Sequence, residues 1–181
     1  ERMETSVSDI YAAGDAVQVK HYVTGTGALI SLAGPANKQG RIIADNICGG
    51  DSCYLGSQGS SVIKVFDLTA AVTGINETNA KKAGLDTDTV ILSPMNHAGY
   101  YPGGKVMTIK LVFEKETYRL LGAQIVGYEG VDKRIDVLAV SIHAGLKATQ
   151  LKDLELAYAP PYSSAKDPVN MAGLWLTIYP K

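Results

Sequence analysis

The pattern of hydrophobic and polar positions beyond residue 60 predicts strands and helices in alternation. Residues 61–67 alternate like a half-buried strand, and residues 89–92 form a short apolar strand. Two longer apolar runs, 105–113 and 120–128, are joined by a charged stretch at hairpin spacing, so we expect them to pair antiparallel. Apolar residues then recur at helical spacing over 135–142. The predicted fold class is α+β, a mainly antiparallel sheet with helices on one face.

Capping residues and prolines set the limits of the other elements. Residues 76–83 form a short predicted helix with Asn76 as its N-cap and Gly84 as its stop. A short acidic helix is expected over 151–156 and must end before the prolines that follow. Residues 158–173 are predicted to be a long shaped loop, followed by an apolar end segment.

The first fifty residues show a different pattern. An apolar run at 10–13 predicts a short strand closed by Gly14, where the backbone can approach a ligand. Asp15 follows, placed either to accept hydrogen bonds from ligand hydroxyls or to act as an N-cap. A helix is predicted over 32–47, and a segment rich in Gly, Ser and Asp at 49–59 marks a domain boundary.

The predicted helix at 32–47 carries a proline in its first turn and an apolar stripe of isoleucines. Pro35 suits the start of a helix, and the stripe consists of Ile42, Ile43 and Ile47. A helix N-terminus presents N–H groups and a partial positive charge, so it can bind an electron-rich ring or a phosphate. An ordinary amphipathic helix explains the same pattern.

Composition and charge exclude several classes of function. With 17 basic and 18 acidic residues, the chain offers no basic stripe for nucleic acid or an anionic membrane. It has no run of eighteen apolar residues and no signal-peptide pattern, so neither a transmembrane helix nor a signal peptide is expected. Two cysteines are too few for a disulfide scaffold, so we expect a cytoplasmic protein. Cys48 and Cys53 lack redox or zinc spacing, and the three histidines fit no metal-ligand pattern. We expect surface thiols and no metal.

Tyrosines in two irregular segments are the candidates for proton chemistry. Tyr100 and Tyr101 lie in a turn rich in Gly and Pro, and Tyr158 begins the loop over 158–173. A tyrosine hydroxyl that faces a pocket can donate a proton. Half-buried aromatic side chains that cover a sheet edge would have the same spacing.

The stretch T-S-V-S-D-I-Y-A-A-G-D-A at residues 5–16 resembles the second flavin motif of the FAD- and NAD(P)-dependent disulfide reductases. The resemblance implies that Asp15, beside Gly14, binds the ribityl chain of FAD. It also implies that the helix at 32–47 points at the flavin ring. Its backbone neighbours would then be Ala33, Pro35 and Ala36.

Three further motifs are similar to the dimerisation domain of coenzyme A disulfide reductases, NADH oxidases and persulfide reductases: H-A-G-Y-Y-P-G, L-G-A-Q-I-V-G-Y-E-G-V-D-K-R-I-D and L-A-Y-A-P-P-Y-S-S-A-K-D-P-V-N-M-A-G. The resemblance implies a homodimer in which Tyr158 and Tyr100 reach the partner's flavin and cysteine. Tyr158 is the expected proton donor, and Tyr101 competes with Tyr100. Lys133 and Arg134 would lie at the dimer seam or the coenzyme A channel, or else at a solvated helix start.

The chain departs from this family in what it lacks. It contains no G-x-G-x-x-G flavin fingerprint, no redox cysteine segment and no second nucleotide domain. We therefore interpret it as a C-terminal fragment, with residues 1–50 the end of an FAD domain and residues 60–181 the dimerisation domain. FAD and NAD(P)H would serve the parent protein. The fragment alone is expected to bind no cofactor and to be inert.

The resemblance leaves the parent's reaction open. The parent would reduce coenzyme A disulfide or persulfide, or it would be an NADH oxidase or peroxidase acting on oxygen or peroxide. A different hypothesis makes the chain a homodimerising module with no chemistry of its own.

Overall fold

The computed structural model describes residues 1–179, and they fall into two compact units. The first unit is Glu1–Gly59, and the second begins at Ser60. We describe each unit by itself. Along the described residues, no helix has the length and apolar character needed to cross a membrane.

The first unit is small and built around one helix. Its elements are η1 (Gly14–Ala16), β1 (Val19–Lys20), β2 (Gly27–Ala28) and α1 (Ala33–Ile47), with β1 and β2 paired antiparallel. The strand predicted over 10–13 is wrong: Tyr11 makes only an isolated bridge, to Glu4, before the chain turns into η1.

Buried amides, rather than an apolar stripe, hold α1 in its unit. Gln39 and Asn46 are the buried residues of the helix, whereas Ile47 is 64% exposed. Gln39 Oε1 accepts a hydrogen bond from the Gly14 N–H at 2.7 Å. The Asn46 amide bonds the backbone of Arg2 and of Ser52 at 2.8–3.0 Å. These bonds tie the helix to the segments before and after it.

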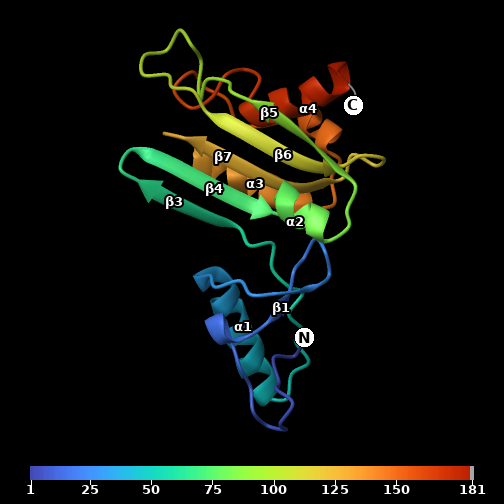
Figure 1. The fold of residues 1–181 in the computed structure, drawn as a ribbon. Coiled ribbons are helices and arrows are strands. Elements are labelled where there is room, and N and C mark those ends of the chain that lie inside the picture. Colours follow the sequence, from blue (N-terminus) through green and yellow to red (C-terminus); the bar gives the residue numbers. More distant parts are fainter. Residues whose placement is uncertain (180–181) are drawn as a thin grey trace. The chain divides into compact units, whose positions relative to one another are not determined.

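The second unit is built on a five-stranded sheet (Figure 1). Its strands are β3 (Ser61–Val65), β4 (Leu68–Gly74), β5 (Thr87–Leu92), β6 (Thr108–Glu114) and β7 (Leu120–Gly127). They lie in the order β3-β4-β7-β6-β5, and every neighbouring pair is antiparallel. The predicted α+β fold and the hairpin between β6 and β7 are confirmed.

The longer helices cover one face of this sheet. The helices of the unit are α2 (Glu77–Lys82), α3 (Val131–His143), the 3-10 helix η2 (Ala148–Asp153) and α4 (Pro168–Ile178). Helix α2 lies on the opposite face, where its Glu77 pairs with Lys110 of β6, next to the core-facing Leu111. Helix α3 lies against β4 and β7, and α4 packs on η2 and contacts β5 and β6 (Figure 1). Leu111, Ile125 and Leu138 are completely buried in the core between the layers.

Capping residues mark the start of α2 and the end of α3, as the sequence predicts. Asn76 accepts a hydrogen bond from the Asn79 N–H at 2.8 Å and so caps α2. Helix α3 ends two residues before Gly145, whose φ of +70° suits glycine at a helix C-terminus.

Gly122 in β7 is required because of close packing. A Cβ there would lie 1.8 Å from the Ile75 carbonyl oxygen, so only glycine fits.

Two elements of the second unit, β4 and α4, differ from the elements that the sequence pattern predicts. The strand predicted over 61–67 ends at Val65, and the chain turns through Phe66 into β4. The loop and apolar end predicted beyond residue 158 contain α4, which begins at Pro168. The acidic helix expected over 151–156 is instead η2, which begins three residues earlier.

Candidate functional site

The candidate site of the second unit is a pair of tyrosine hydroxyls. Tyr100, in the loop between β5 and β6, and Tyr158, in the loop after η2, meet with 2.9 Å between their hydroxyl oxygens. Both side chains remain open to solvent, at 75% and 46% exposure. Two loops that lie far apart in the sequence thus present one polar spot at the surface.

The hydrogen bond between the hydroxyls changes the acidity of one of them. The bond from Tyr100, and to a smaller degree burial and the charge of Tyr100, raise the pKa of Tyr158 above its usual value near 10. Tyr158 is therefore fully protonated at neutral pH. A protonated phenol with a hydroxyl neighbour can donate a hydrogen bond or a proton to an anion.

The structure separates Tyr101 from this pair. Its ring packs edge-on against His97, with 5.6 Å between ring centroids and an interplanar angle of 83°. His97 is buried, and its Nδ1 lies 3.1 Å from the Ala98 carbonyl oxygen. This contact matches the aromatic packing role, so Tyr100 is the better candidate of the two adjacent tyrosines.

Arg134 is completely buried beneath the two tyrosine loops. Its guanidinium bonds both carboxylate oxygens of Asp167 at 2.9–3.2 Å. It also donates to the carbonyl oxygens of Gly130 at 3.0 Å and Asn96 at 2.9 Å. A solvated helix start does not describe this residue. With its charge and donors engaged inside the domain, Arg134 is poorly placed to bind a substrate directly.

Asp167 completes the buried pair and is not among the site residues predicted from the sequence. Burial raises the pKa of its carboxyl, but hydrogen bonds from Arg134, the Val169 N–H and Ser163 outweigh that effect and lower it. Asp167 also caps α4, with proline at the first helical position. The D-P-V-N sequence is a recognisable helix start that could have identified this residue.

Lys133 lies beside the buried pair but faces the surface. Its Nζ is 4.0 Å from Asp167 Oδ2 and 3.5 Å from the Ala157 carbonyl oxygen, and its side chain is 35% exposed. The residue after Ala157 is Tyr158, so this ammonium lies near the tyrosine loop. Lys133 therefore remains the candidate for binding an anionic substrate group.

The other predicted site residues lie in the first unit. Gly14 has φ +81° and no atom within 4 Å of where a Cβ would lie, so its backbone is open to a ligand. Asp15 follows in η1 and is exposed; the N-cap position of that turn belongs to Ala13. The Gln39 bond to the Gly14 N–H connects this turn to α1.

Helix α1 begins without a capping side chain. Leu32 occupies its N-cap position and makes no side-chain cap. Ala33 is exposed and Pro35 and Ala36 are half-buried in the first turn. Since no side chain closes this end, its partial positive charge can act on a ligand.

Cys48 and Cys53 are exposed free thiols. No group of His, Cys, Asp and Glu side chains in residues 1–179 could hold a metal ion.

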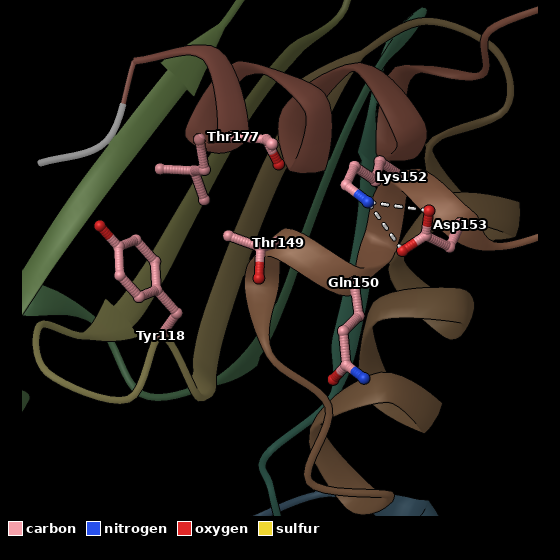
Figure 2. A pocket seen from close by; sticks show the side chains of 7 residues that line it. Tyr118, Thr149, Gln150, Lys152, Asp153 and Thr177 are labelled. Atoms are coloured by element: carbon pink, nitrogen blue, oxygen red, sulfur yellow. Dashed lines mark hydrogen bonds and ion pairs between the residues drawn. The ribbon is translucent and has the colours of Figure 1, made fainter.

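A shallow pocket occurs elsewhere in the second unit (Figure 2). It is lined by Tyr118, Thr149, Gln150, Lys152, Asp153, Leu176 and Thr177. Lys152 and Asp153 form an ion pair at 2.9 Å on its rim. None of the predicted site residues lines this pocket, so it is separate from the tyrosine pair.

Comparison with known proteins agrees with the arrangement of motifs and fold. The chain is 40% identical over 169 residues to the NAD(P)H sulfur oxidoreductase (CoA-dependent) of Pyrococcus abyssi, covering 93% of this chain and 38% of that protein. It is 37% identical over 171 residues to the coenzyme A disulfide reductase of Staphylococcus epidermidis, covering 94% and 39%. The solved structure of reduced Bacillus anthracis CoADR-RHD is 52% identical with a TM-score of 0.93, covering 98% and 32%.

The chain thus spans well under half the length of these relatives. Residues 60–168 match the model of the pyridine nucleotide-disulphide oxidoreductase dimerisation domain. That match covers most of the chain and includes both tyrosines of the pair. The chain therefore belongs to the pyridine nucleotide-disulphide oxidoreductase family.

Proposed function

We propose that this chain is the C-terminal part of a flavoprotein that uses NAD(P)H to reduce coenzyme A disulfide or persulfide. The observation that carries the proposal is the pair of exposed hydroxyls of Tyr100 and Tyr158, 2.9 Å apart. The pair provides a proton donor at the surface, which reduction of a sulfur–sulfur bond needs. The relatives named for coenzyme A disulfide and sulfur reduction support this choice of substrate.

The overall reaction balances with one hydride and one proton. NAD(P)H gives up a hydride, which carries two electrons, and becomes NAD(P)⁺. Those electrons break the S–S bond of coenzyme A disulfide, and two thiols form after one further proton is taken from solution. In this scheme Tyr158 supplies the proton to the departing thiolate, and Tyr100 holds the Tyr158 hydroxyl in place.

The residues of the first unit fit part of an FAD site. Bound FAD would relay the two electrons between the nicotinamide and the sulfur chemistry. Asp15 would accept hydrogen bonds from the ribityl hydroxyls, beside the open backbone of Gly14. The backbone at Ala33, Pro35 and Ala36, at the uncapped start of α1, would face the flavin ring. The pyrophosphate loop and the redox cysteine belong to the parent.

The active protein is proposed to be a cytoplasmic homodimer. The match to a dimerisation domain supports self-association, and the tyrosine pair of one subunit would then serve the flavin and cysteine of the other. Two exposed free thiols suit a reducing compartment. Because the chain has no pyrophosphate loop or redox cysteine motif, the isolated fragment is proposed to be inert.

Substrate turnover by the full-length parent tests the proposal. NADH oxidation is followed with coenzyme A disulfide, with an organic persulfide and with dissolved oxygen, each as the sole acceptor. We expect the sulfur acceptors to be reduced at least about tenfold faster than oxygen, a difference of about 1.4 kcal/mol in the barrier. Faster oxygen consumption would assign an oxidase, and a dimer without turnover would leave only the assembly role.

A further inference from the structure

We propose that the buried Arg134–Asp167 pair is the positioning device that sets the Tyr100–Tyr158 hydroxyl pair. The proposal rests on the proposed function of the tyrosines, and it adds residues that touch neither hydroxyl. Arg134 lies in α3, and Asp167 lies just before α4. Both are almost completely buried, at 0% and 2% exposure.

The guanidinium of Arg134 connects the backbones of the two tyrosine loops. Its Nη2 donates to the Asn96 carbonyl oxygen at 2.9 Å, four residues before Tyr100. The same nitrogen lies 3.3 Å from the Tyr162 carbonyl oxygen, four residues after Tyr158. One rigid, planar group therefore fixes the base of both loops at once.

Two further contacts strengthen this connection between the loops. The Ala98 N–H donates to the Ser163 carbonyl oxygen at 3.0 Å, which joins the loops directly. The Ser163 hydroxyl, also fully buried, donates to Asp167 Oδ2 at 2.7 Å and lies 3.3 Å from Arg134. The two loops thus share a buried polar network below the surface.

The hydroxyl pair cannot hold this geometry without support. Both tyrosines are substantially exposed, and a hydrogen bond between solvated groups exchanges readily with bonds to water. Ordering two loops costs conformational entropy that one such bond does not offset. The buried network must therefore supply the order, because its charged groups have no water to replace a lost partner.

Asp167 is needed because a buried guanidinium requires a counter-charge. It accepts hydrogen bonds from Arg134, from Ser163 and from the Val169 N–H, which is the cap of α4. Lys133 cannot substitute for Arg134, since its ammonium is 4.0 Å from Asp167 and partly exposed. The pair therefore connects α3, α4 and both tyrosine loops, and Arg134 acts as a positioning residue.

The test uses the full-length parent carrying Arg134→Lys. Lysine keeps the charge, but its single ammonium cannot reach Asp167 and both loop carbonyls together. The readout is the ionisation midpoint of Tyr158, followed by NMR of carbon-labelled tyrosine and assigned with Tyr158→Phe. We expect the midpoint to fall to the value measured in Tyr100→Phe, where the hydroxyl pair is absent. Lys152→Met, at the separate surface pocket, is the matched control and should leave the midpoint as in the wild type.

A folded Arg134→Lys protein whose Tyr158 midpoint equals that of the wild type would overturn the proposal. If that variant does not accumulate as folded protein, Ser163→Ala is used instead, because it removes the buried hydroxyl that joins the Tyr158 loop to Asp167 and Arg134. Turnover is measured separately. A shifted midpoint together with unchanged turnover would keep the positioning role and reject the proposed proton donation, so the two proposals fail in different ways.

Discussion

The two units of this chain are stabilised in different ways. In Glu1–Gly59 the buried hydrophobic residues are Val19 and Tyr54. Helix α1 is held there mainly by hydrogen bonds of the buried amides of Gln39 and Asn46. From Ser60 on, a full apolar core lies between the sheet and its helices. Hydrophobic burial is the dominant favourable term in folding, so the second unit has what an independent domain needs and the first does not.

The two units should differ most in stability when the chain is cut between them and each piece is studied alone. We expect residues 60–181 alone to fold and to unfold cooperatively in urea. Residues 1–59 alone should show no cooperative transition, because they bury too little apolar surface. Far-UV circular dichroism on each piece measures this. A cooperative transition in residues 1–59 would contradict the conclusion that this unit lacks a sufficient apolar core.

Within the second unit, Arg134→Met should have the next largest effect. It leaves the Asp167 carboxylate buried without its partner, and we expect the free energy of unfolding of residues 60–181 to fall by about 3–5 kcal/mol. Lys152→Met removes an exposed ion pair and should cost at most about 1 kcal/mol. Equal losses of unfolding free energy in the two variants, measured by urea denaturation, would show that the buried pair stabilises the unit no more than the exposed pair does.

In the first unit, Asn46→Ala should have a smaller and local effect. It leaves the Ser52 N–H without its acceptor, which should cost about 1–3 kcal/mol. Amide hydrogen exchange of Ser52 in the intact chain measures the cost as lost protection. Asn37→Ala, at an exposed position of the same helix, is the control. If Ser52 kept its protection in Asn46→Ala, the amide would not be what holds the helix to this segment.

Acid should destabilise the second unit through protonation of Asp167. This is the smallest of the expected effects, since it is absent near neutral pH. Its pKa is lowered in the folded state, so its contribution to stability is complete above the ordinary aspartate value of about 3.9 and is lost as pH falls through the lower folded value. Thermal unfolding of residues 60–181 across this acidic range should show that loss. Asp167→Asn should flatten the acid dependence, and an unchanged slope would contradict the assignment.

The second unit was largely predictable from sequence because hydrophobic periodicity reflects burial in a core. The strands β6 and β7 and the helix α3 follow from their apolar spacing, and α2 from its Asn76 cap. Helix α4 was missed because its apolar positions show little amphipathic periodicity and follow a segment rich in proline, although Asp167 and Pro168 marked its start. In the first unit the isoleucine stripe of α1 was misleading, since amides make the buried contacts there.

The sequence likewise predicts only part of the candidate site. The irregular segments single out the tyrosines and the motif resemblance implies their roles, but local pattern could not show that Tyr100, and not Tyr101, meets Tyr158. Nor could it show that Arg134 is buried, because the charged sequence around it is equally typical of a solvated helix start. Long-range contacts between loops leave no periodic signal in the chain.

The protonating role of Tyr158 is tested by turnover of coenzyme A disulfide with NADH, measured for the full-length parent as wild type, Tyr158→Phe and Tyr162→Phe. Tyr162 is a 70% exposed tyrosine in the same loop and serves as the matched control. We expect Tyr158→Phe to lower kcat by about 10²–10⁴-fold with flavin still bound, and Tyr162→Phe to turn over as the wild type does. Equal turnover in all three proteins would contradict a protonating role for Tyr158.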